Sequence, residues 1–318
     1  MAMKLLVTGG SGFIGSNFIR YWLARHSSDS IVNLDALTYA GNPNNLKDIE
    51  PDSRYTFIHG DVCDAETVKR AFDEVDTVVH FAAESHVDNS IVGSLPFMRT
   101  NVLGTHTLLE EMKSRGDQVQ RFHHISTDEV FGSLDLDAIE KFNEKTAYDP
   151  RSPYSASKAA SDHICRAYFH THGLPITISN CSNNYGPYQH EEKFIPVMIA
   201  KAIADTSLPV YGEGKNIRDW LHVEDHCRGI EVVLLKGKIG ETYCFGGDTE
   251  VANIDMAKKI LHILDKPESL ISFVEDRKGH DLRYAIDASK AKRELGWEPL
   301  KVFDEGLKKT IEWYRGMG

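Results

Sequence analysis

The 318-residue sequence lacks the long apolar runs and the excess of positive charge that mark membrane proteins and nucleic-acid-binding proteins. No uninterrupted apolar run approaches the ~18 residues that a membrane-spanning helix needs. The formal net charge is −11, which disfavours binding to nucleic acid and to anionic membranes. The opening stretch, MAMKLLVTGG, passes into a strand-like run without the layout of a signal peptide. We therefore expect a cytoplasmic protein that has no nucleic-acid or membrane partner.

Cysteine is also scarce, because the sequence has only 5 cysteines and none of them forms a CxxC pair. Their odd number and wide spacing favour buried thiols in a reducing compartment over disulfides or a zinc site. Low-complexity linkers and internal repeats are missing as well. The chain is 41% hydrophobic and 26% charged, an ordinary globular composition, and is long enough for one large or two modest domains.

Short apolar segments alternate with helical patterns in the first half of the chain. This alternation predicts an α/β fold with a doubly wound parallel sheet of the Rossmann type, covered by helices on both faces. The strands are expected at 4–8, 31–35, 56–59, 77–80, 121–126 and 175–181, and the helices over 14–26, 65–72, 96–113 and 154–172.

The pattern changes after about residue 180, where loops rich in Asn, Gly and Pro appear. We predict a nucleotide-binding Rossmann domain over 1–180 and a smaller mixed α/β substrate domain over 181–318, with the chain returning to the first sheet around 222–245. Helices are expected here over 195–204, 224–236, 253–264 and 303–314.

A glycine-rich turn, with Gly9, Gly12 and Gly15, lies between the first expected strand and the first helix. Glycines there allow a pyrophosphate to approach the backbone and the helix N-terminus. A plain strand-to-helix turn can look the same, but Asp35 lies 20 residues beyond Gly15, at the end of the second strand. Its carboxylate would accept from ribose hydroxyls and repel a 2′-phosphate, which favours NAD over NADP. Asp61 fits an adenine contact and a turn equally well.

Tyr154 and Lys158 form a YxxxK pair whose i, i+4 spacing puts both side chains on one face of a helix. A free tyrosine has a pKa near ~10, and a neighbouring ammonium would stabilise its phenolate as a base. A surface tyrosine beside a lysine would have the same spacing. In this context, after the fifth strand of a glycine-rich domain, the chain resembles the extended short-chain dehydrogenase/reductase family. The resemblance implies an NAD cofactor, a catalytic tyrosine and lysine, and a nucleotide-sugar substrate held by the C-terminal part.

Three polar residues, Thr127, Asp128 and Glu129, follow the apolar run of the fifth strand. Carboxyl ends of parallel strands line the ligand crevice, and a sugar dehydratase needs both an acid and a base there. Once C4 is a ketone, Glu129 could remove the C5 proton and Asp128 could protonate the departing C6 hydroxyl, if their pKa values differ. The strand must end at this point, since alternation would send the two side chains to opposite faces. A capping cluster on a surface loop is the alternative.

Further segments widen the resemblance. AAESHVDNSI, STDEVFG, YSASK, NCSNNYGPYQHEEKFIP, NIRDWLHVEDH and DRKGHDLRYAID occur in this order over residues 82 to 287 and resemble the dTDP-glucose 4,6-dehydratase family. The resemblance implies NAD-dependent dehydration of dTDP-glucose to a 4-keto-6-deoxy sugar, in a homodimer built on the helices over 96–113 and 154–172. The choice of thymidine rests on the resemblance alone. The sequence departs from the family pattern, without loss of a catalytic group, at Asn89, Phe131, Glu191, Phe194 and Lys278.

The expected binding residues follow from the same resemblance. The cofactor is expected to contact Gly9, Gly12, Phe13, Ile14, Gly15, Asp35, Asp61, Val62, Ala83, Thr100, Tyr154, Lys158 and Asn184. The substrate is expected to contact His86, Thr127, Asn183, Lys193, Phe194, Val210, Tyr211, Arg218, Asn253, Arg277 and His280. Among these, Arg218 could bind the diphosphate through its planar fork, although an arginine beside Asp219 is often a structural ion pair.

Other interpretations stay open at this point. His222 and His226 have the i, i+4 spacing of zinc-binding helices, but the strand-like run WLHV favours a structural role, and the chemistry needs no metal. The chain could be another nucleotide-sugar enzyme of the same fold, such as a 4-epimerase or a UDP-glucuronate decarboxylase. It could also be a catalytically idle nucleotide-binding relative, although the five intact catalytic candidates argue against this.

Overall fold

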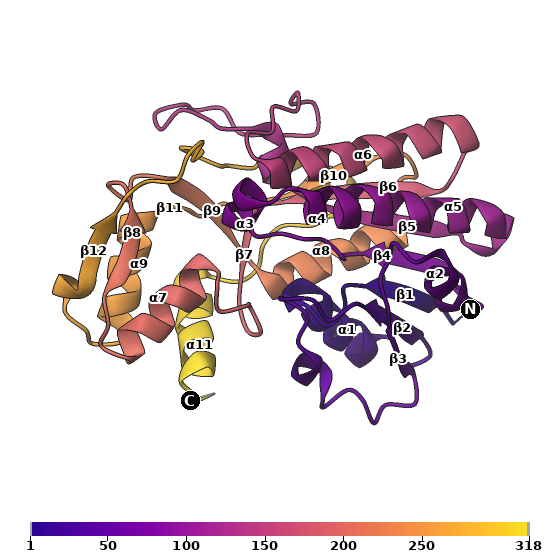
Figure 1. The fold of residues 1–318 in the computed structure, drawn as a ribbon, viewed down its shortest axis with the longest axis horizontal. Coiled ribbons are helices and arrows are strands. Elements are labelled where there is room, and N and C mark those ends of the chain that lie inside the picture. Colours follow the sequence, from indigo (N-terminus) through magenta and orange to yellow (C-terminus); the bar gives the residue numbers. More distant parts are fainter. Residues whose placement is uncertain (1, 317–318) are drawn as a thin grey trace.

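The computed structural model describes residues 2–316. A seven-stranded sheet, parallel throughout, forms its centre in the order β10-β6-β5-β4-β1-β2-β3 (Figure 1). The order reverses between β1 and β4, which is the switch point of a doubly wound fold. The Rossmann-type prediction is confirmed, and each predicted strand is found within one residue. The strands are β1 Lys4–Thr8, β2 Ser30–Asp35, β3 Tyr55–His59, β4 Thr77–His80, β5 Arg121–Thr127, β6 Ile176–Cys181 and β10 Thr242–Phe245.

Helices cover both faces of this sheet. On one face α1 (Phe13–Arg25) packs with α8 (Val223–Lys236), and on the other lie α2 (Ala65–Ala71), α5 (Thr105–Arg115) and α6 (Pro153–His172). Residues of β1 alternate between the two cores, because Leu5 and Val7 face α1 while Leu6 faces α2 and α5. A strand buried on both faces is therefore continuously apolar, as the sequence pattern indicated.

The helix predicted over 96–113 is present but is not regular. It comprises α4 (Leu95–Phe97), a π-helical segment (Met98–Gly104) and α5, and a short helix, α3 (Val87–Val92), precedes it. The π-helical segment carries Asn101, whose amide accepts from the backbone N–H of Glu84 at 2.8 Å and donates to its carbonyl at 3.0 Å. This irregularity, of a kind often found near functional sites, fixes the loop that follows β4.

The C-terminal part adds two small sheets and a third core. The two sheets have the orders β11-β9-β7 and β12-β8. The four helices predicted after residue 180 are found within one residue, and the short strands were not predicted individually. The elements are β7 Asn183–Tyr185, α7 Phe194–Ile203, β8 Leu208–Tyr211, β9 Ile217–His222, β11 Glu250–Ala252, α9 Asn253–Ile263, β12 Ile271–Val274, α10 Ser289–Leu295 and α11 Phe303–Arg315.

Within this C-terminal half, α8 and β10 join the seven-stranded sheet beside α1 and β6. The division into two domains with a boundary near residue 180 stays a prediction. None of the helices over residues 2–316 is long and apolar enough to cross a membrane. All five cysteines are unpaired thiols, four of them buried and Cys63 half-buried.

Candidate active site

Strand β5 ends at Thr127, and Asp128–Phe131 form a 3-10 turn, η4. The Thr127 hydroxyl accepts from the backbone N–H of Glu129 at 3.3 Å, and Gly132 closes the turn at φ 89°. Both carboxylates therefore leave the alternation of the strand and line one cavity. Asp128 is 2% exposed, so the alternative of a surface capping cluster is wrong.

The cavity has a volume of about 330 Å³ and opens at the carboxyl ends of the parallel strands, where ligands bind in doubly wound folds. It brings together all of the candidate cofactor residues and all five catalytic candidates. Its lining includes Gly9, Gly12, Phe13, Ile14, Gly15, Asp35, Asp61, Val62, Ala83, Thr100, Thr127, Asp128, Glu129, Tyr154, Lys158, Asn183, Asn184 and Lys193.

The glycine-rich turn forms one end of this cavity. Gly9 has φ 69°, and a Cβ at Gly15 would lie 2.3 Å from the Gly9 carbonyl oxygen. No side chain caps α1 at Gly12, which leaves the first N–H groups of a 13-residue helix free for an anion. Asp35 is held at the end of β2, where its two oxygens accept from the backbone N–H groups of Ser11 and Leu37, both at 2.8 Å. This geometry fits a dinucleotide, with its pyrophosphate at α1 and a ribose at Asp35.

Tyr154 and Lys158 lie in the first two turns of α6, whose start is fixed by a capping box between Ser152 and Ser155. The Lys158 ammonium donates to the Ile125 carbonyl at 2.7 Å. Burial and the nearby Glu129 raise the pKa of Tyr154 well above its ordinary value, and the Thr127 hydroxyl opposes this through a hydrogen bond. We expected the Lys158 ammonium to stabilise the Tyr154 phenolate and so to lower its pKa. Lys158 is not among the groups that dominate this pKa in the unliganded protein.

The two acidic groups differ in their surroundings. Burial raises the pKa of Asp128 well above its ordinary range, and the charges of Glu129 and Asp219 add to this effect. Burial also raises the pKa of Glu129, but Lys193 and Arg218 oppose the increase. Asp128 thus holds a proton more readily than Glu129, as an acid–base pair requires.

Arg218 lies on β9 and is buried, with its guanidinium 4.2 Å above the Tyr284 ring and one N–H donating to the Asp281 carbonyl at 3.0 Å. It does not pair with Asp219, whose oxygens accept from the N–H groups of Gly247 and Thr249. Neighbouring strand residues point to opposite faces, so the structural ion pair considered for this sequence is wrong.

Several expected substrate residues lie outside the cavity lining. Arg277 pairs with Asp88 at 2.7 Å and lies 5.4 Å from the Tyr211 ring, while His280 contacts Tyr211 edge-on. Arg218 and Arg277 both act on the pKa of Glu129, which places this cluster on the Glu129 side of the cavity. The expected substrate residues that do not line the cavity are His86, Phe194, Val210, Tyr211, Arg218, Asn253, Arg277 and His280.

Sequence reasoning missed part of the cavity wall. Glu192 lines it, with one carboxylate oxygen 3.7 Å from His86 and the other 3.6 Å from Lys193. Tyr39, on the loop after β2, supports two lining residues: its hydroxyl lies 3.2 Å from the Ser85 hydroxyl, and its ring packs edge-on against the His190 ring. The sequence signal that could have indicated this part of the wall is the run HEEK at 190–193. It places four charged or ionisable residues inside a loop rich in Asn and Gly.

The two histidines near α8 have structural positions. His226 is fully buried, its ring lies 2.9 Å from the Asn184 side-chain oxygen, and burial lowers its pKa to about 3. His222 ends β9 and caps α8 by accepting from Glu224. Residues 2–316 contain no cluster of three groups that could hold a metal ion. His226 therefore orients Asn184 at the cavity.

One cavity contains the glycine-rich turn, the Tyr154–Lys158 pair and the turn from Thr127 to Glu129. This combination defines an extended short-chain dehydrogenase/reductase. A family model described as GDP-mannose 4,6 dehydratase matches residues 6–310. The chain belongs to this dehydratase family and, within it, to the dTDP-glucose 4,6-dehydratases.

Individual relatives are similar over almost their whole length. The dTDP-glucose 4,6-dehydratase of Xanthomonas campestris is 53% identical, over 97% of this chain and 92% of the relative. The crystal structure of the Streptomyces venezuelae dTDP-glucose 4,6-dehydratase DesIV, with NAD and TYD bound, has a TM-score of 0.95 at 48% identity, over 99% and 97% of the two chains. That of Bacillus anthracis, in complex with NAD, has a TM-score of 0.92 at 46% identity, over 99% and 97%.

Proposed function

We propose that this protein is an NAD-dependent dTDP-glucose 4,6-dehydratase, a hydro-lyase that forms dTDP-4-keto-6-deoxyglucose. The observation that carries the proposal is the position of Asp128 and Glu129, which line one cavity with Tyr154 and Lys158. A 4-epimerase or a simple reductase needs only a group that exchanges a proton at the hydroxyl during hydride transfer. Elimination of water requires an additional acid and base in the cavity.

The cofactor site fits NAD. The backbone around Gly9 and Gly12 and the start of α1 would hold the pyrophosphate, and Asp35 would hold the ribose hydroxyls. Lys158 would hold the ribose that carries nicotinamide. NAD, when bound, supplies the hydride acceptor for C4 and returns the hydride to C6.

The side chains divide the proton transfers. Tyr154, hydrogen-bonded to Thr127, removes the C4 hydroxyl proton, and the resulting ketone acidifies C5. Glu129 then takes the C5 proton, while Asp128 gives its proton to the departing C6 hydroxyl, which leaves as water. A proton returns to C5 as the hydride reaches C6. The raised pKa of Asp128 is the property that a general acid at neutral pH needs.

The substrate diphosphate carries negative charge, although the protein as a whole is acidic, with a net charge of −11. The cluster of Arg218, Arg277, Tyr211 and His280 offers a local basic and aromatic surface next to Glu129. A planar guanidinium binds phosphate oxygens in pairs, so we assign the diphosphate to Arg218 and Arg277. Preference for thymidine rests on the family.

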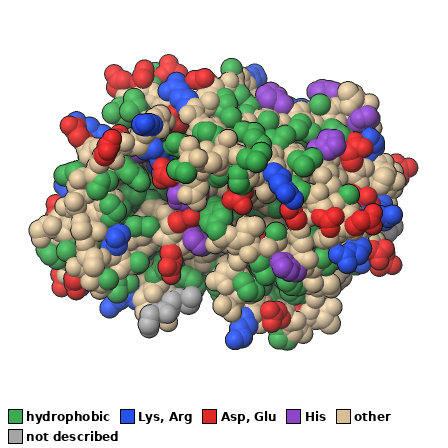
Figure 2. All heavy atoms as spheres, in the orientation of Figure 1, with side chains coloured by type: hydrophobic (Ala, Val, Ile, Leu, Met, Phe, Trp, Pro, Cys, Tyr) green, Lys and Arg blue, Asp and Glu red, His purple; other side chains and the backbone are tan. Residues whose placement is uncertain are grey.

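Homodimer formation and a cytoplasmic location belong to the same proposal. Hydrophobic side chains gather where Figure 1 places α3, α4 and α6 (Figure 2), and Val92 is 90% and Leu95 76% exposed there. Of the apolar positions on the 96–113 segment, Leu103 is exposed, whereas Leu108, Leu109 and Met112 are buried in the core of the subunit. Support for a dimer therefore rests on Val92, Leu95 and Leu103.

One assay tests the reaction. The purified protein is incubated with dTDP-glucose and NAD in deuterated water, and the product is analysed by mass spectrometry and NMR. We expect the loss of one water and incorporation of solvent deuterium at C5. A sugar of unchanged mass with inverted C4 would identify a 4-epimerase instead. The absence of turnover with every nucleotide sugar tried would favour an idle relative.

A further inference from the structure

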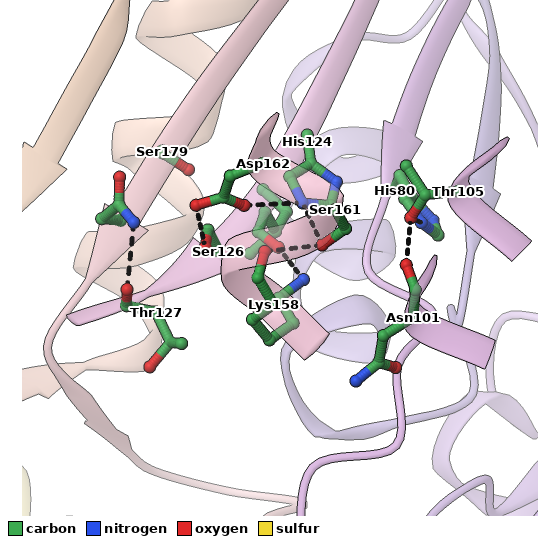
Figure 3. A network of polar contacts seen from close by, with 12 residues as sticks. His80, Asn101, Thr105, His124, Ser126, Thr127, Lys158, Ser161, Asp162 and Ser179 are labelled. Carbon is green, nitrogen blue, oxygen red and sulfur yellow. Dashed lines mark hydrogen bonds and ion pairs between the residues drawn. The ribbon is translucent and has the colours of Figure 1, made fainter. Parts of the chain in front are cut away.

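A fully buried carboxylate, Asp162, lies behind the cavity on α6, one helical turn after Lys158 (Figure 3). One of its oxygens accepts from the Ser126 hydroxyl at 2.7 Å and from the Tyr148 hydroxyl at 2.8 Å. The other lies 3.0 Å from the His124 Nε2 atom. Asp162 is thus joined to β5 immediately before the residues proposed to perform the chemistry, and no step assigned above uses it.

Asp162 is the ionised residue in the group that it forms with Ser126, Tyr148 and His124. Burial opposes its ionisation, but the hydrogen bond from His124 and the charge of Lys158 outweigh burial and place the pKa of Asp162 below its ordinary value. Burial lowers the pKa of His124 to about 4, so that ring is neutral at neutral pH. The anion is stabilised by the Ser126 and Tyr148 hydroxyls, which both donate to one of its oxygens, and by the His124 ring nitrogen 3.0 Å from the other.

Apart from Asp162, few groups balance the positive charge of Lys158. Its ammonium is buried and makes one hydrogen bond, to a backbone carbonyl. Burial lowers the pKa of Lys158, and Asp162 is the strongest opposing influence. The surrounding thiols and imidazoles are neutral at neutral pH, because burial raises the pKa of the thiols and lowers that of the rings. The titratable groups that face Lys158 or Asp162 are His80 on β4, His124 on β5, Cys165 and Arg166 on α6, Cys181 on β6, and Tyr148.

We propose that Asp162 is a positioning residue of the dehydratase: its carboxylate is the counter-charge that keeps the Lys158 ammonium protonated and ties α6 to the end of β5. The inference rests on the proposed function, in which Lys158 acts as a cation beside Tyr154 and the cofactor. An ammonium without a nearby anion in this site would tend to release its proton. Ser126 precedes Thr127 directly, so the same carboxylate also fixes the strand end from which Thr127 and the acidic turn project.

The test is the pH dependence of Asp162→Asn, which removes the charge and preserves the shape. We expect the basic limb of its kcat profile to move to lower pH by about one unit or more, since an opposite charge at i, i+4 spacing is lost. The KM for dTDP-glucose should change by less than about twofold, because Asp162 does not line the cavity. The matched control is Tyr148→Phe, which removes one hydrogen bond to Asp162 but no charge. Its basic limb should coincide with that of the wild type.

The outcomes separate a positioning role from a merely structural one. If folded Asp162→Asn protein has a lower melting temperature but the pH profile of the wild type, the inference is overturned. If Asp162→Asn does not fold, the titration of Lys158 in the wild type decides, followed by NMR of lysines labelled at the ε carbon and assigned with Lys158→Met. Lys158 should be protonated at about pH 7.5, and a neutral Lys158 amine at that pH would overturn the inference. Turnover of dTDP-glucose by the wild type tests the proposed function separately, because the Lys158 titration needs no turnover.

Discussion

Glu129 follows Asp128 directly in the chain, yet the two carboxyl groups lie in different electrostatic surroundings. The charges of Glu129 and Asp219 add to the raised pKa of Asp128, and Arg218 opposes them, whereas Lys193 and Arg218 both oppose the increase in the pKa of Glu129. The chain separates them because β5 ends at Thr127 and η4 turns both side chains into one cavity. Two acidic residues that are adjacent in sequence can therefore serve as acid and base at the same pH.

Glu129→Gln should stop the reaction between oxidation and elimination. The amide keeps the shape of the side chain but cannot accept the C5 proton, so we expect overall turnover to fall by about 10²-fold or more. Oxidation of C4 should persist, and reduced nicotinamide should accumulate when dTDP-glucose is added to the NAD-loaded variant. Stopped-flow absorbance measures this accumulation. Normal turnover by the variant would show that Glu129 is not the base.

Asp128→Asn should lower activity but raise stability at alkaline pH. The pKa of Asp128 is higher in the folded than in the unfolded protein, so its stabilising contribution is full below the unfolded pKa of ~3.9 and is lost as the pH rises towards the folded pKa. Asparagine has no such dependence. We expect the variant to melt about 2 °C or more above the wild type at pH 8, and the difference to shrink near pH 4. Calorimetry at the two pH values measures it, and an equal loss of melting temperature at both would contradict the electrostatic interpretation.

The sequence predicted those parts of the molecule that depend on local pattern. The six strands and the start of α6, predicted at Tyr154 and found at Pro153, follow from apolar runs, turn residues and the proline. Contacts between distant segments had no local signal. The π-helical segment around Asn101 depends on its bonds to Glu84, and the position of Glu192 depends on Lys193 and His86.

The roles of charged residues were predicted less well than their positions. Arg218 was expected to bind the diphosphate, but its position on β9 was not predicted. Its stacking on Tyr284 and its separation from Asp219 depend on the arrangement of three chain segments. Likewise, the i, i+4 spacing put Tyr154 and Lys158 on one helix face. It could not show that burial and Glu129 dominate the pKa of Tyr154.

Gly12→Ala and Gly15→Ala should separate cofactor binding from folding. A Cβ at Gly15 would lie 2.3 Å from the Gly9 carbonyl oxygen, so we expect Gly15→Ala to destabilise the fold by about 2 kcal/mol or more. A Cβ at Gly12 meets only that oxygen, at 3.3 Å, and the variant should fold. It should nevertheless bind NAD more weakly, because the methyl group would lie on the open side where the pyrophosphate approaches. Thermal melting and NAD titration by calorimetry measure the two effects, and equal NAD affinity in Gly12→Ala and the wild type would count against a pyrophosphate site here.

Arg218→Lys should weaken substrate binding more than it slows the reaction. Lysine keeps the charge but loses the planar fork that would bind two diphosphate oxygens, so we expect KM for dTDP-glucose to rise by about tenfold, with a smaller effect on kcat. Steady-state kinetics with saturating NAD measure both constants.

Arg283→Lys is the matched control, because Arg283 is equally buried but pairs with Glu250 at 2.6 Å and donates to the Ala138 carbonyl, away from the cavity lining. It should lower the melting temperature and leave KM within about twofold of the wild type. If both variants raised KM equally, the effect would reflect loosening of the C-terminal part and not loss of a diphosphate contact at Arg218. A diphosphate site at Arg218 requires that KM rise only in Arg218→Lys. Inhibition of this variant by dTDP, a competitive inhibitor, should weaken to the same extent.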